Sequence, residues 1–459
     1  MTLPAAPPLD QLRAELDGGR VLSDRDLMEP YRRDRTTAVP AGMPCAVVEA
    51  RSVDQVVATL RWASRHRVPV VTRGAGTSLA GGATALDGGL VLSLARMDAI
   101  LEMAPDERLA VVEAGVITAD LDRAARAHGL MYAPDPSSYE ICTIGGNLAT
   151  NAGGLRCLKY GVTRDSVLGL EVVLADGRRL KTGHRTVKGV VGYDLTGLFV
   201  GSEGTLGVIT SATMRLRPTP PVAPVTLAAT FSSLATAAEA VSSIVRSGTG
   251  ASLLELMDRT TLRAIDDWKN VGLGPQTAAM LIAQCDGHDA TTAAERIAEV
   301  CRNVGAADVV VCGDESEAAH LLDIRRLAFP AAERLGACLV EDVCVPIPAL
   351  RAMIERIEAV SLAHGVLIGT VAHAGDGNLH PVFVFPRELA EPPPEVWAAA
   401  DEVFRAALAL GGTLTGEHGV GSLKRRWLGQ ELADDALALH HVIKDALDPL
   451  GILNPGRAI

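Results

Sequence analysis

A proline-rich segment, Arg217-Pro-Thr-Pro-Pro-Val-Ala-Pro224, separates two parts of this chain that have different sequence patterns. Repeated prolines stiffen a chain and remove backbone donors, so such a segment is typical of a linker between domains. A chain of 459 residues also exceeds what one hydrophobic core usually supports. We therefore expect a domain over residues 39–218, a second domain over 219–459, and a helical N-terminal segment over 1–38, where leucines recur with helical spacing.

The first domain alternates short apolar runs with glycine-rich turns, around one clear helical pattern at Val53–Arg67. Runs of β-branched and aliphatic residues that are bounded by turn residues predict strands. The strand candidates are Val68–Thr72, Gly89–Ser93, Ala110–Ala114 and Leu170–Leu174.

The second domain alternates strands with helices. Residues 225–230 and 279–285 have strand patterns, and residues 234–247 and 290–304 follow them with helical patterns. Further helices are expected over 395–410 and 430–448. A strand followed by a helix, repeated in this way, predicts an α+β domain built on an antiparallel sheet.

The composition argues against several classes of protein. Acidic residues outnumber basic ones by 55 to 43, and the net charge of −12 argues against a nucleic-acid partner, because phosphates attract a basic surface. The eight cysteines form no C-x-x-C pair, so we expect neither disulfides nor an iron–sulfur cluster within this chain. We recognise no signal peptide and no membrane-spanning run, and we expect a cytoplasmic protein, with peripheral docking at the inner membrane left open.

Three glycine-rich segments lie within the first domain: Arg73–Gly82, Thr143–Gly154 and Val200–Ile209. Glycine allows backbone N–H groups to approach an anion closely, so such loops can surround phosphates. None of the three has the G-x-G-x-x-G pattern of a Rossmann fold, and each one alone is typical of a simple turn. Three in one domain, carrying serine, threonine and asparagine, favour a long phosphate-bearing cofactor.

The second domain contains His373-Ala-Gly-Asp-Gly-Asn-Leu-His380, and Glu417-His418 follows it. Apolar β-branched residues flank the first motif, so Asp376-Gly377 is predicted to be the two-residue loop of a β-hairpin. In that register His373 lies directly opposite His380, with Cβ atoms roughly 4.5–5.5 Å apart. Imidazole and carboxylate are ligands of divalent metals. The alternative is a pair of hydrogen-bonded histidines beside a turn.

Several motifs of the first domain form an ordered series: Arg73-Gly-Ala-Gly-Thr-Ser, Pro134-Asp-Pro-Ser-Ser, Thr143-Ile-Gly-Gly-Asn, Asn151-Ala-Gly-Gly and Gly201-Ser-Glu-Gly-Thr. This series resembles the FAD domain of the vanillyl-alcohol-oxidase / p-cresol-methylhydroxylase (PCMH) superfamily. The histidine motif, Glu417-His418 and a final Asn454-Pro-Gly resemble, more narrowly, the FAD-linked D-2-hydroxyacid dehydrogenases. That group includes the flavin subunit of glycolate oxidase, D-lactate dehydrogenase and D-2-hydroxyglutarate dehydrogenase.

The resemblance implies an α+β fold with a two-part PCMH-type FAD-binding domain, a ferredoxin-like antiparallel-sheet substrate domain and a helical C-terminal segment that returns to the flavin. Relatives with covalent FAD often carry histidine where this chain has Thr77, so non-covalent FAD is expected. The implied FAD contacts are Arg73, Gly74, Ala75, Gly76, Thr77, Ser78, Pro134, Ser137, Thr143, Gly146, Asn147, Asn151, Gly153, Ile209 and Asn454.

The resemblance also places a metal on His373, His380 and Glu417, with zinc expected and manganese or iron as alternatives. It makes His418 the catalytic base. Adjacent residues of an extended segment point to opposite sides, so Glu417 can face the metal while His418 faces the substrate. By the same resemblance, Arg325 binds the substrate carboxylate. Arg326 is the competing assignment. The alternative without a role in binding is a salt bridge on the surface of a helix.

Two departures from the family pattern bear on the substrate. Val340 and Val382 stand where the D-2-hydroxyglutarate enzymes carry a lysine and a polar residue. Their loss favours a small monocarboxylate such as glycolate or D-lactate over a diacid. A D-2-hydroxyglutarate dehydrogenase, a non-catalytic electron-transfer flavin subunit and a metallohydrolase remain alternatives.

The resemblance implies a separate electron acceptor, which is an iron–sulfur subunit, a quinone, a cytochrome or an electron-transfer flavoprotein. It also implies a homodimer.

Overall fold

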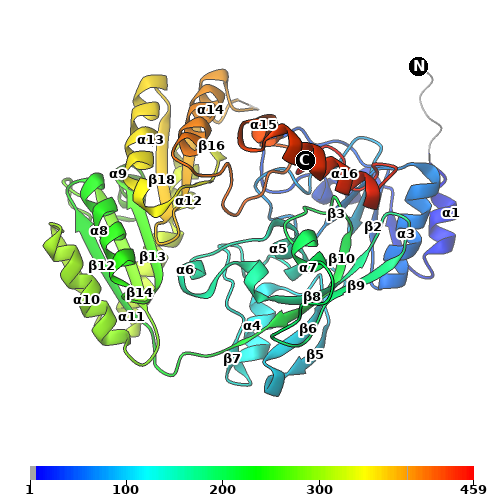
Figure 1. Cartoon of the computed structure of the whole chain (residues 1–459). Coiled ribbons are helices and arrows are strands. Elements are labelled where there is room, and N and C mark those ends of the chain that lie inside the picture. The colour runs from blue at the N-terminus through cyan, green and yellow to red at the C-terminus, as the bar shows by residue number, and fades with distance from the viewer. Residues whose placement is uncertain (1–6, 390) are drawn as a thin grey trace. The chain divides into compact units, whose positions relative to one another are not determined.

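Figure 1 shows the computed structural model of the chain, which describes residues 7–389 and 391–459. The chain divides into two compact units. The first unit consists of Met1–Ala152, Val162–Thr219 and Glu417–Ile459, and the second consists of Gly153–Gly161 and Pro220–Gly416. The main segment of the second unit therefore begins within the proline-rich segment.

The first unit contains a small mixed sheet, with both parallel and antiparallel strand pairs. Its order is β1 (Arg20–Leu22), β2 (Ala46–Glu49), β4 (Leu90–Ser93) and β3 (Val70–Arg73). Strand β4 runs parallel to both β2 and β3, whereas β1 is antiparallel to β2. The helical prediction for residues 1–38 is wrong at β1, because pairing with the edge of β2 overrides the local pattern.

Helix α3 (Val53–His66) covers this sheet, and its sequence contains the features that favour a helix. The Ser52 hydroxyl accepts a hydrogen bond from the Gln55 N–H at 3.3 Å and caps the first turn. Val56 and Leu60 recur at helical spacing and are buried in the core of the sheet. The helix ends where Arg67 adopts a left-handed conformation with φ 52°.

The second sheet of the first unit is antiparallel throughout. Its order is β5 (Ile100–Ala104), β6 (Leu109–Glu113), β10 (Val208–Arg215), β8 (Val167–Val173) and β9 (Arg179–Gly183). Two helices, α4 (Thr118–Arg126) and α5 (Ile144–Thr150), contribute buried side chains to its core. The two sheets together form the two-part domain that was predicted.

The remaining elements of the first unit are short, apart from one C-terminal helix. They are α1 (Leu9–Glu15), α2 (Arg25–Met28), η1 (Glu29–Tyr31), η2 (Pro105–Glu107), β7 (Leu130–Met131), η3 (Thr163–Ser166), α7 (Leu195–Phe199), β11 (Arg217–Pro218), η5 (Arg425–Trp427), α15 (Leu428–Glu431) and α16 (Asp434–Leu447). Beyond α16 the chain returns to the small sheet, where Leu453 forms a parallel bridge with Val70.

The second unit is built on one large sheet whose strand pairs are all antiparallel, as predicted. Its order is β15 (Asp308–Val311), β12 (Val225–Phe231), β14 (Ala279–Cys285), β13 (Ala251–Asp258), β18 (Leu367–His373), β19 (Asn378–Phe385) and β16 (Ala337–Val340), and β17 (Val343–Cys344) also pairs with β19.

Helices cover both faces of this sheet, since every residue of the central strand β13 is buried. Its odd-numbered residues, among them Leu253 and Met257, pack with α9 (Arg259–Lys269), α11 (Glu315–Arg326) and α12 (Ala328–Leu335). The other helices are α6 (Cys157–Tyr160), α8 (Leu234–Ser247), α10 (Ala290–Asn303), η4 (Ile347–Ala349), α13 (Leu350–His364) and α14 (Pro394–Ala409). Within the described part of the chain, no helix is both long and apolar enough to cross a membrane.

Candidate active site

In the first unit, Asn454 joins three of the motifs that were predicted to bind FAD. Its side-chain amide donates hydrogen bonds to the carbonyl of Gly82 at 3.0 Å and to the carbonyl of Glu203 at 2.7 Å. The C-terminal tail, the first glycine-rich segment and the Ser-Glu-Gly segment therefore lie together, although hundreds of residues separate them in sequence. The buried Oδ1 of Asn454 has no hydrogen-bond partner among the described residues, which fits a site that receives a polar ligand.

The first glycine-rich loop is packed against the second one. A Cβ atom on Gly74 would collide with the hydroxyl of Thr143, and a Cβ atom on Gly76 would collide with the guanidinium of Arg73. Gly76 also has a φ of 73°, in the left-handed region that favours glycine. Backbone that has no room for side chains fits a cradle for a long phosphate-bearing cofactor.

The side chains of several predicted FAD residues form hydrogen bonds within the protein. Arg73 is buried and donates to the carbonyls of Ala83 at 3.5 Å and Pro30 at 3.3 Å. The amide of Asn147 donates to the Thr118 hydroxyl at 2.8 Å. The side chains of these two residues therefore hold their loops in place.

The other predicted FAD residues are distributed around the same motifs. Thr143 caps α5 by accepting from the Gly146 N–H at 3.2 Å, and Asn151 ends that helix with a φ of 52°. Ile209 is buried in β10. Ala75, Thr77 and Ser78 complete the first loop, Pro134 and Ser137 lie in the coil after β7, and Gly153 belongs to the second unit.

In the second unit, the histidine motif forms the turn between β18 and β19. The predicted register is wrong: His373 pairs with Asn378, two residues short of His380, and residues 374–377 form the turn. Gly377 permits this longer turn with a φ of 84°. Because a strand alternates its faces with a period of two, a shift of two residues leaves both histidines on one face.

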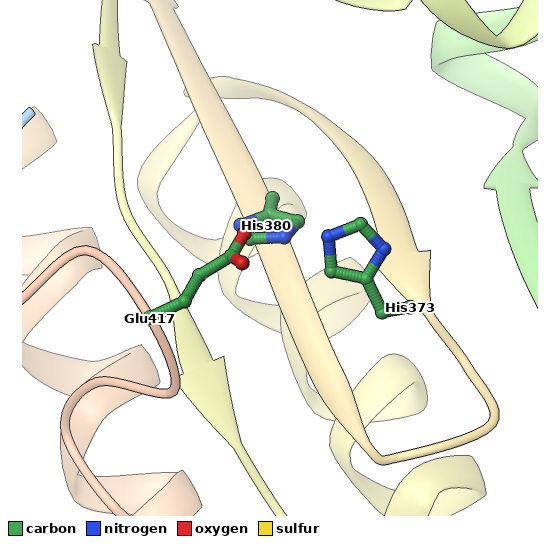
Figure 2. Close-up of side chains that lie close together, drawn as sticks. All are labelled: His373, His380 and Glu417. Carbon is green, nitrogen blue, oxygen red and sulfur yellow. The ribbon is translucent and has the colours of Figure 1, made fainter. Parts of the chain in front are cut away.

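The side chains of His373, His380 and Glu417 converge (Figure 2), and their ligand atoms all lie within 4.8 Å of one another. The two imidazole rings meet edge to face, with centroids 4.9 Å apart. Two ring nitrogens and a carboxylate at this separation fit a divalent metal, which such ligands bind at about 2.0–2.2 Å. The residues that were predicted as metal ligands are thus brought together.

The backbone that leads to Glu417 is fixed by a buried carboxylate of the second unit. Asp342 accepts hydrogen bonds from the Thr415 hydroxyl at 2.9 Å and from the Gly416 N–H at 2.7 Å. Gly416 itself lies so close to Asn378 that a Cβ atom there would be 2.6 Å from the amide oxygen. The position of Glu417 therefore follows from the loop before it.

Glu255, in the middle of β13, connects the histidine motif to the predicted substrate arginine. It lies directly opposite His373 in the sheet. One carboxylate oxygen is 2.7 Å from Nδ1 of His373, and the other accepts from Nε of Arg325 at 2.7 Å. Burial raises the pKa of Glu255, but the charges and hydrogen bonds of His373 and Arg325 outweigh burial and hold that pKa below its ordinary value.

The side chains of Arg325 and Arg326 lie in different surroundings. The side chain of Arg325 is only 14% exposed and turns toward Glu255, whereas Arg326 is 61% exposed and pairs with Asp323 on the surface of α11. A surface ion pair of this kind contributes little stability. The geometry favours Arg325 over its neighbour as the arginine of an internal site.

Val340 and Val382 are directly paired across β16 and β19. Val382 is buried and follows Asn378 and His380 on the same face of β19, since these positions differ by two. The face that carries the predicted metal ligands therefore continues into an apolar wall.

Glu417 and His418 lie in a bend outside any helix or strand, and the chain after them is held by Glu203. The Glu203 carboxylate accepts from the Val420 N–H at 2.7 Å and from the Gly421 N–H at 2.8 Å. Burial raises the pKa of Glu203 to about 7, despite the two donors. Glu203 thus fixes the turn that follows the predicted catalytic base.

Comparison with protein families decides the class of this protein. A family described as "FAD linked oxidases, C-terminal domain" matches residues 220–458, and one described as "FAD binding domain" matches residues 44–183. The chain belongs to the FAD-linked oxidase family. It is a flavoprotein oxidoreductase, with FAD as the cofactor.

Three relatives of this FAD-linked oxidase cover most of its length. Glycolate oxidase subunit GlcD of Bacillus subtilis is 43% identical and covers 96% of this chain and 92% of its own. Glycolate oxidase subunit GlcD of Escherichia coli K12 is 39% identical, with 98% of this chain and 90% of its own covered. D-lactate dehydrogenase of Archaeoglobus fulgidus is 36% identical, with 94% and 96% covered.

Solved structures confirm the fold that the resemblance implied. p-Cresol methylhydroxylase with substrate bound superposes with a TM-score of 0.80 at 22% identity, and covers 98% of this chain and 96% of its own. 4-Ethylphenol oxidase from Gulosibacter chungangensis gives 0.79 at 20% identity, covering 100% and 98%. At these identities the likeness shows the fold alone.

Three acidic residues of this FAD-linked oxidase were not predicted from its sequence: Glu203, Glu255 and Asp342. Glu255 had a recognisable signal, because it is the only charged residue in the apolar run Ser252–Met257, and a buried charge requires partners. Glu203 lies inside a glycine-rich segment that was interpreted only as a cofactor loop. Asp342 had no comparable signal.

Proposed function

We propose that this FAD-linked oxidase oxidises a small D-2-hydroxy monocarboxylic acid to the 2-oxo acid, with glycolate and D-lactate as the favoured substrates. The names of its relatives, glycolate oxidase subunit and D-lactate dehydrogenase, support this substrate class. The apolar pair Val340 and Val382 supports a monocarboxylate over a diacid, because a second carboxylate buried there would lack a polar partner.

The observation that carries the proposal is the state of Arg325. Its Nε is engaged by Glu255, and neither terminal nitrogen has a hydrogen-bond acceptor within residues 7–389 and 391–459. A guanidinium with two free terminal NH₂ groups is suited to bind a carboxylate with two parallel hydrogen bonds. We assign Arg325 to the substrate carboxylate.

His373, His380 and Glu417 would hold a divalent metal, with zinc favoured and manganese or iron also compatible with nitrogen and oxygen ligands. A metal in this place would lower the pKa of the substrate hydroxyl, as it does for water. We assign His418 as the base that takes the hydroxyl proton, since a neutral imidazole accepts a proton near neutral pH. The hydrogen on the carbon that carries this hydroxyl would then leave as hydride, and a bound FAD would supply the acceptor for its two electrons.

The glycine-rich loops of the first unit would bind the FAD without a covalent bond, because Thr77 offers no nucleophilic ring nitrogen. We further propose that reoxidation of the flavin requires a separate electron acceptor, since the related GlcD chains are described as subunits. An iron–sulfur subunit, a quinone, a cytochrome and an electron-transfer flavoprotein are the candidates, and a homodimer is the proposed assembly.

The test is anaerobic reduction of the purified flavoprotein by a hydroxy acid. The reduction is measured as the loss of visible flavin absorbance. Glycolate, D-lactate, L-lactate and D-2-hydroxyglutarate are compared, each with and without a metal chelator. We expect glycolate or D-lactate to bleach the flavin fastest and the chelator to slow the reaction. Faster bleaching by D-2-hydroxyglutarate would contradict the monocarboxylate assignment, and a flavin that none of the four reduces would contradict the proposed function.

A further inference from the structure

A negative charge in the middle of a buried strand requires a specific explanation. Glu255 lies within β13, where all residues are buried, and its own side chain is 0% exposed. Its neighbours Leu254 and Leu256 are apolar, and a leucine at position 255 would suit the strand better than a carboxylate. Burying a charge is unfavourable unless partners compensate it fully. The partners of Glu255 therefore indicate what the residue does.

The carboxylate divides its two oxygens between two residues. Oε1 faces Nδ1 of His373 and Oε2 accepts from Nε of Arg325, each at 2.7 Å. His373 comes from the adjacent strand β18, directly opposite Glu255, whereas Arg325 comes from helix α11. One rigid group in the sheet thus contacts both a proposed metal ligand and the proposed substrate arginine.

For His373, this contact decides which ring nitrogen is available. A carboxylate can only accept, so Nδ1 must carry the hydrogen, and the lone pair lies on Nε2. A histidine whose Nδ1–H is held by a carboxylate presents Nε2 in a fixed orientation and is a stronger ligand. The assignment of the tautomer follows from the hydrogen bond, because the hydrogen itself is placed by the network.

For Arg325, the contact fixes the plane of the guanidinium. With Nε held, the terminal edge made by the two Nη atoms is the one left for a carboxylate. A 2-hydroxy acid carries its hydroxyl and its carboxylate on adjacent carbons, so the groups that bind them must keep a fixed spacing. Residues on two different elements keep such a spacing best when a third residue holds both.

We infer that Glu255 is a positioning residue that sets the metal-binding tautomer of His373 and the orientation of Arg325 together. The substrate part of this inference rests on the proposed function, whereas the metal part concerns the protein and a metal ion alone. A purely structural carboxylate would only neutralise the charge of Arg325, and its position relative to His373 would not matter.

The experiment compares Glu255→Gln and Glu255→Asp with the wild-type holoprotein. Glutamine keeps the size but can offer an oxygen to only one of the two donors. Aspartate keeps the charge but is one methylene shorter and cannot span both partners. Met257→Leu, on the same face of β13, serves as the packing control, because volume-conserving core substitutions are tolerated. Circular dichroism and FAD content establish that each variant is folded.

The first measurement is the affinity for Zn²⁺ and Mn²⁺, obtained by competition with a chromogenic chelator in the absence of substrate. We expect both Glu255 variants to bind the metal about 10- to 100-fold more weakly, as is usual when the partner of a ligating histidine is removed. The ¹⁵N chemical shifts of the His373 ring should also move from a single Nδ1–H tautomer to a mixture. The Met257→Leu protein should match the wild type in both measurements.

The second measurement is the KM of whichever 2-hydroxy acid reduces the wild-type flavin, which should rise in both Glu255 variants. Unchanged metal affinity in Glu255→Gln, or a Glu255→Asp protein that behaves like the wild type, would overturn the inference, and so would a wild-type protein that binds no divalent ion. If no hydroxy acid reduces the wild-type flavin, the proposed function fails, but metal affinity and the His373 tautomer still decide the role of Glu255.

Discussion

The candidate site of the first unit is built mainly from backbone, whereas the candidate site of the second unit is built from side chains. In the first unit, the cofactor motifs are glycine-rich loops held by amides and hydroxyls such as those of Asn454 and Thr143, and their side chains are mostly uncharged. In the second unit, the groups that converge are ionisable side chains: His373, Glu255 and Arg325. A backbone site should be sensitive to added atoms, whereas a side-chain site should be sensitive to the charge and reach of each residue.

The pKa values of buried carboxylates also differ between those held by backbone groups and those held by side chains. Glu203 and Asp258 are held mainly by backbone N–H groups, and burial raises their pKa values to about 7 and about 6. Glu255 is equally buried but faces two cationic or polar side chains, and its pKa lies below the ordinary value. Because burial opposes ionisation in all three, the donors decide the direction.

The largest effect is expected from His418→Ala. Loss of a general base costs roughly 10²- to 10⁴-fold in rate, so flavin reduction by the hydroxy acid should slow by that factor. The contents of FAD and metal should not change. Anaerobic stopped-flow absorbance measures the rate, and His440→Ala, on the exposed face of α16, is the matched control. Equal rates in His418→Ala and the wild type would rule out His418 as the base.

The next effect is expected from Arg325→Lys. Lysine keeps the charge but loses the forked donor geometry, and a disrupted buried ion pair costs about 2–5 kcal/mol, so KM should rise by roughly 10². Arg326→Lys, one residue away on the surface of the same helix, should leave KM unchanged. Steady-state kinetics with an artificial electron acceptor compares the two. The opposite order would mean that the neighbouring arginine binds the carboxylate.

The local patterns of the sequence predicted several elements of the fold. The helical pattern over 234–247 is α8, and the strand pattern over 279–285 is β14. The strands β1 and β13 were not predicted, because β1 depends on pairing with a distant strand edge and β13 is apolar without alternation. Patterns of period two or 3.6 report burial on one face, whereas β13 is buried on both faces and β1 has only three residues.

The candidate site was partly predictable for a similar reason. The predicted metal ligands His373 and His380 lie together with Glu417 although the register of the hairpin was wrong, because a shift of two residues leaves both histidines on the same face. Glu255 is 118 residues from His373 in sequence, and only the assembled sheet brings the two together. Contacts between distant segments leave little trace in a single sequence.

A smaller effect is expected from Gly74→Ala, which tests the backbone site. The added Cβ would collide with the Thr143 hydroxyl, and overpacking of this kind costs about 1–3 kcal/mol, so FAD should bind roughly 5- to 150-fold more weakly. Gly82→Ala is the control, because the nearest atom to its Cβ would be 3.4 Å away, an ordinary contact. FAD content after dialysis measures the difference. Equal retention of FAD in the two variants would contradict the cradle.

The smallest effect is a dependence of stability on pH that originates in Glu203. Its pKa is about 7 in the folded protein and near the ordinary value of about 4.3 in the unfolded chain, so between these values the folded state binds more protons. Stability from this group is therefore complete at low pH and is lost as the pH rises toward 7, by about 1 kcal/mol per pH unit. Urea unfolding at pH 5, 6 and 7 should show a steeper loss of stability in the wild type than in Glu203→Gln. The difference between the two slopes belongs to Glu203, because other buried acids such as Asp258 are common to both proteins. An equal slope in both proteins would mean that the two backbone donors hold Glu203 ionised, and the distinction between backbone-bound and cation-bound carboxylates would then fail.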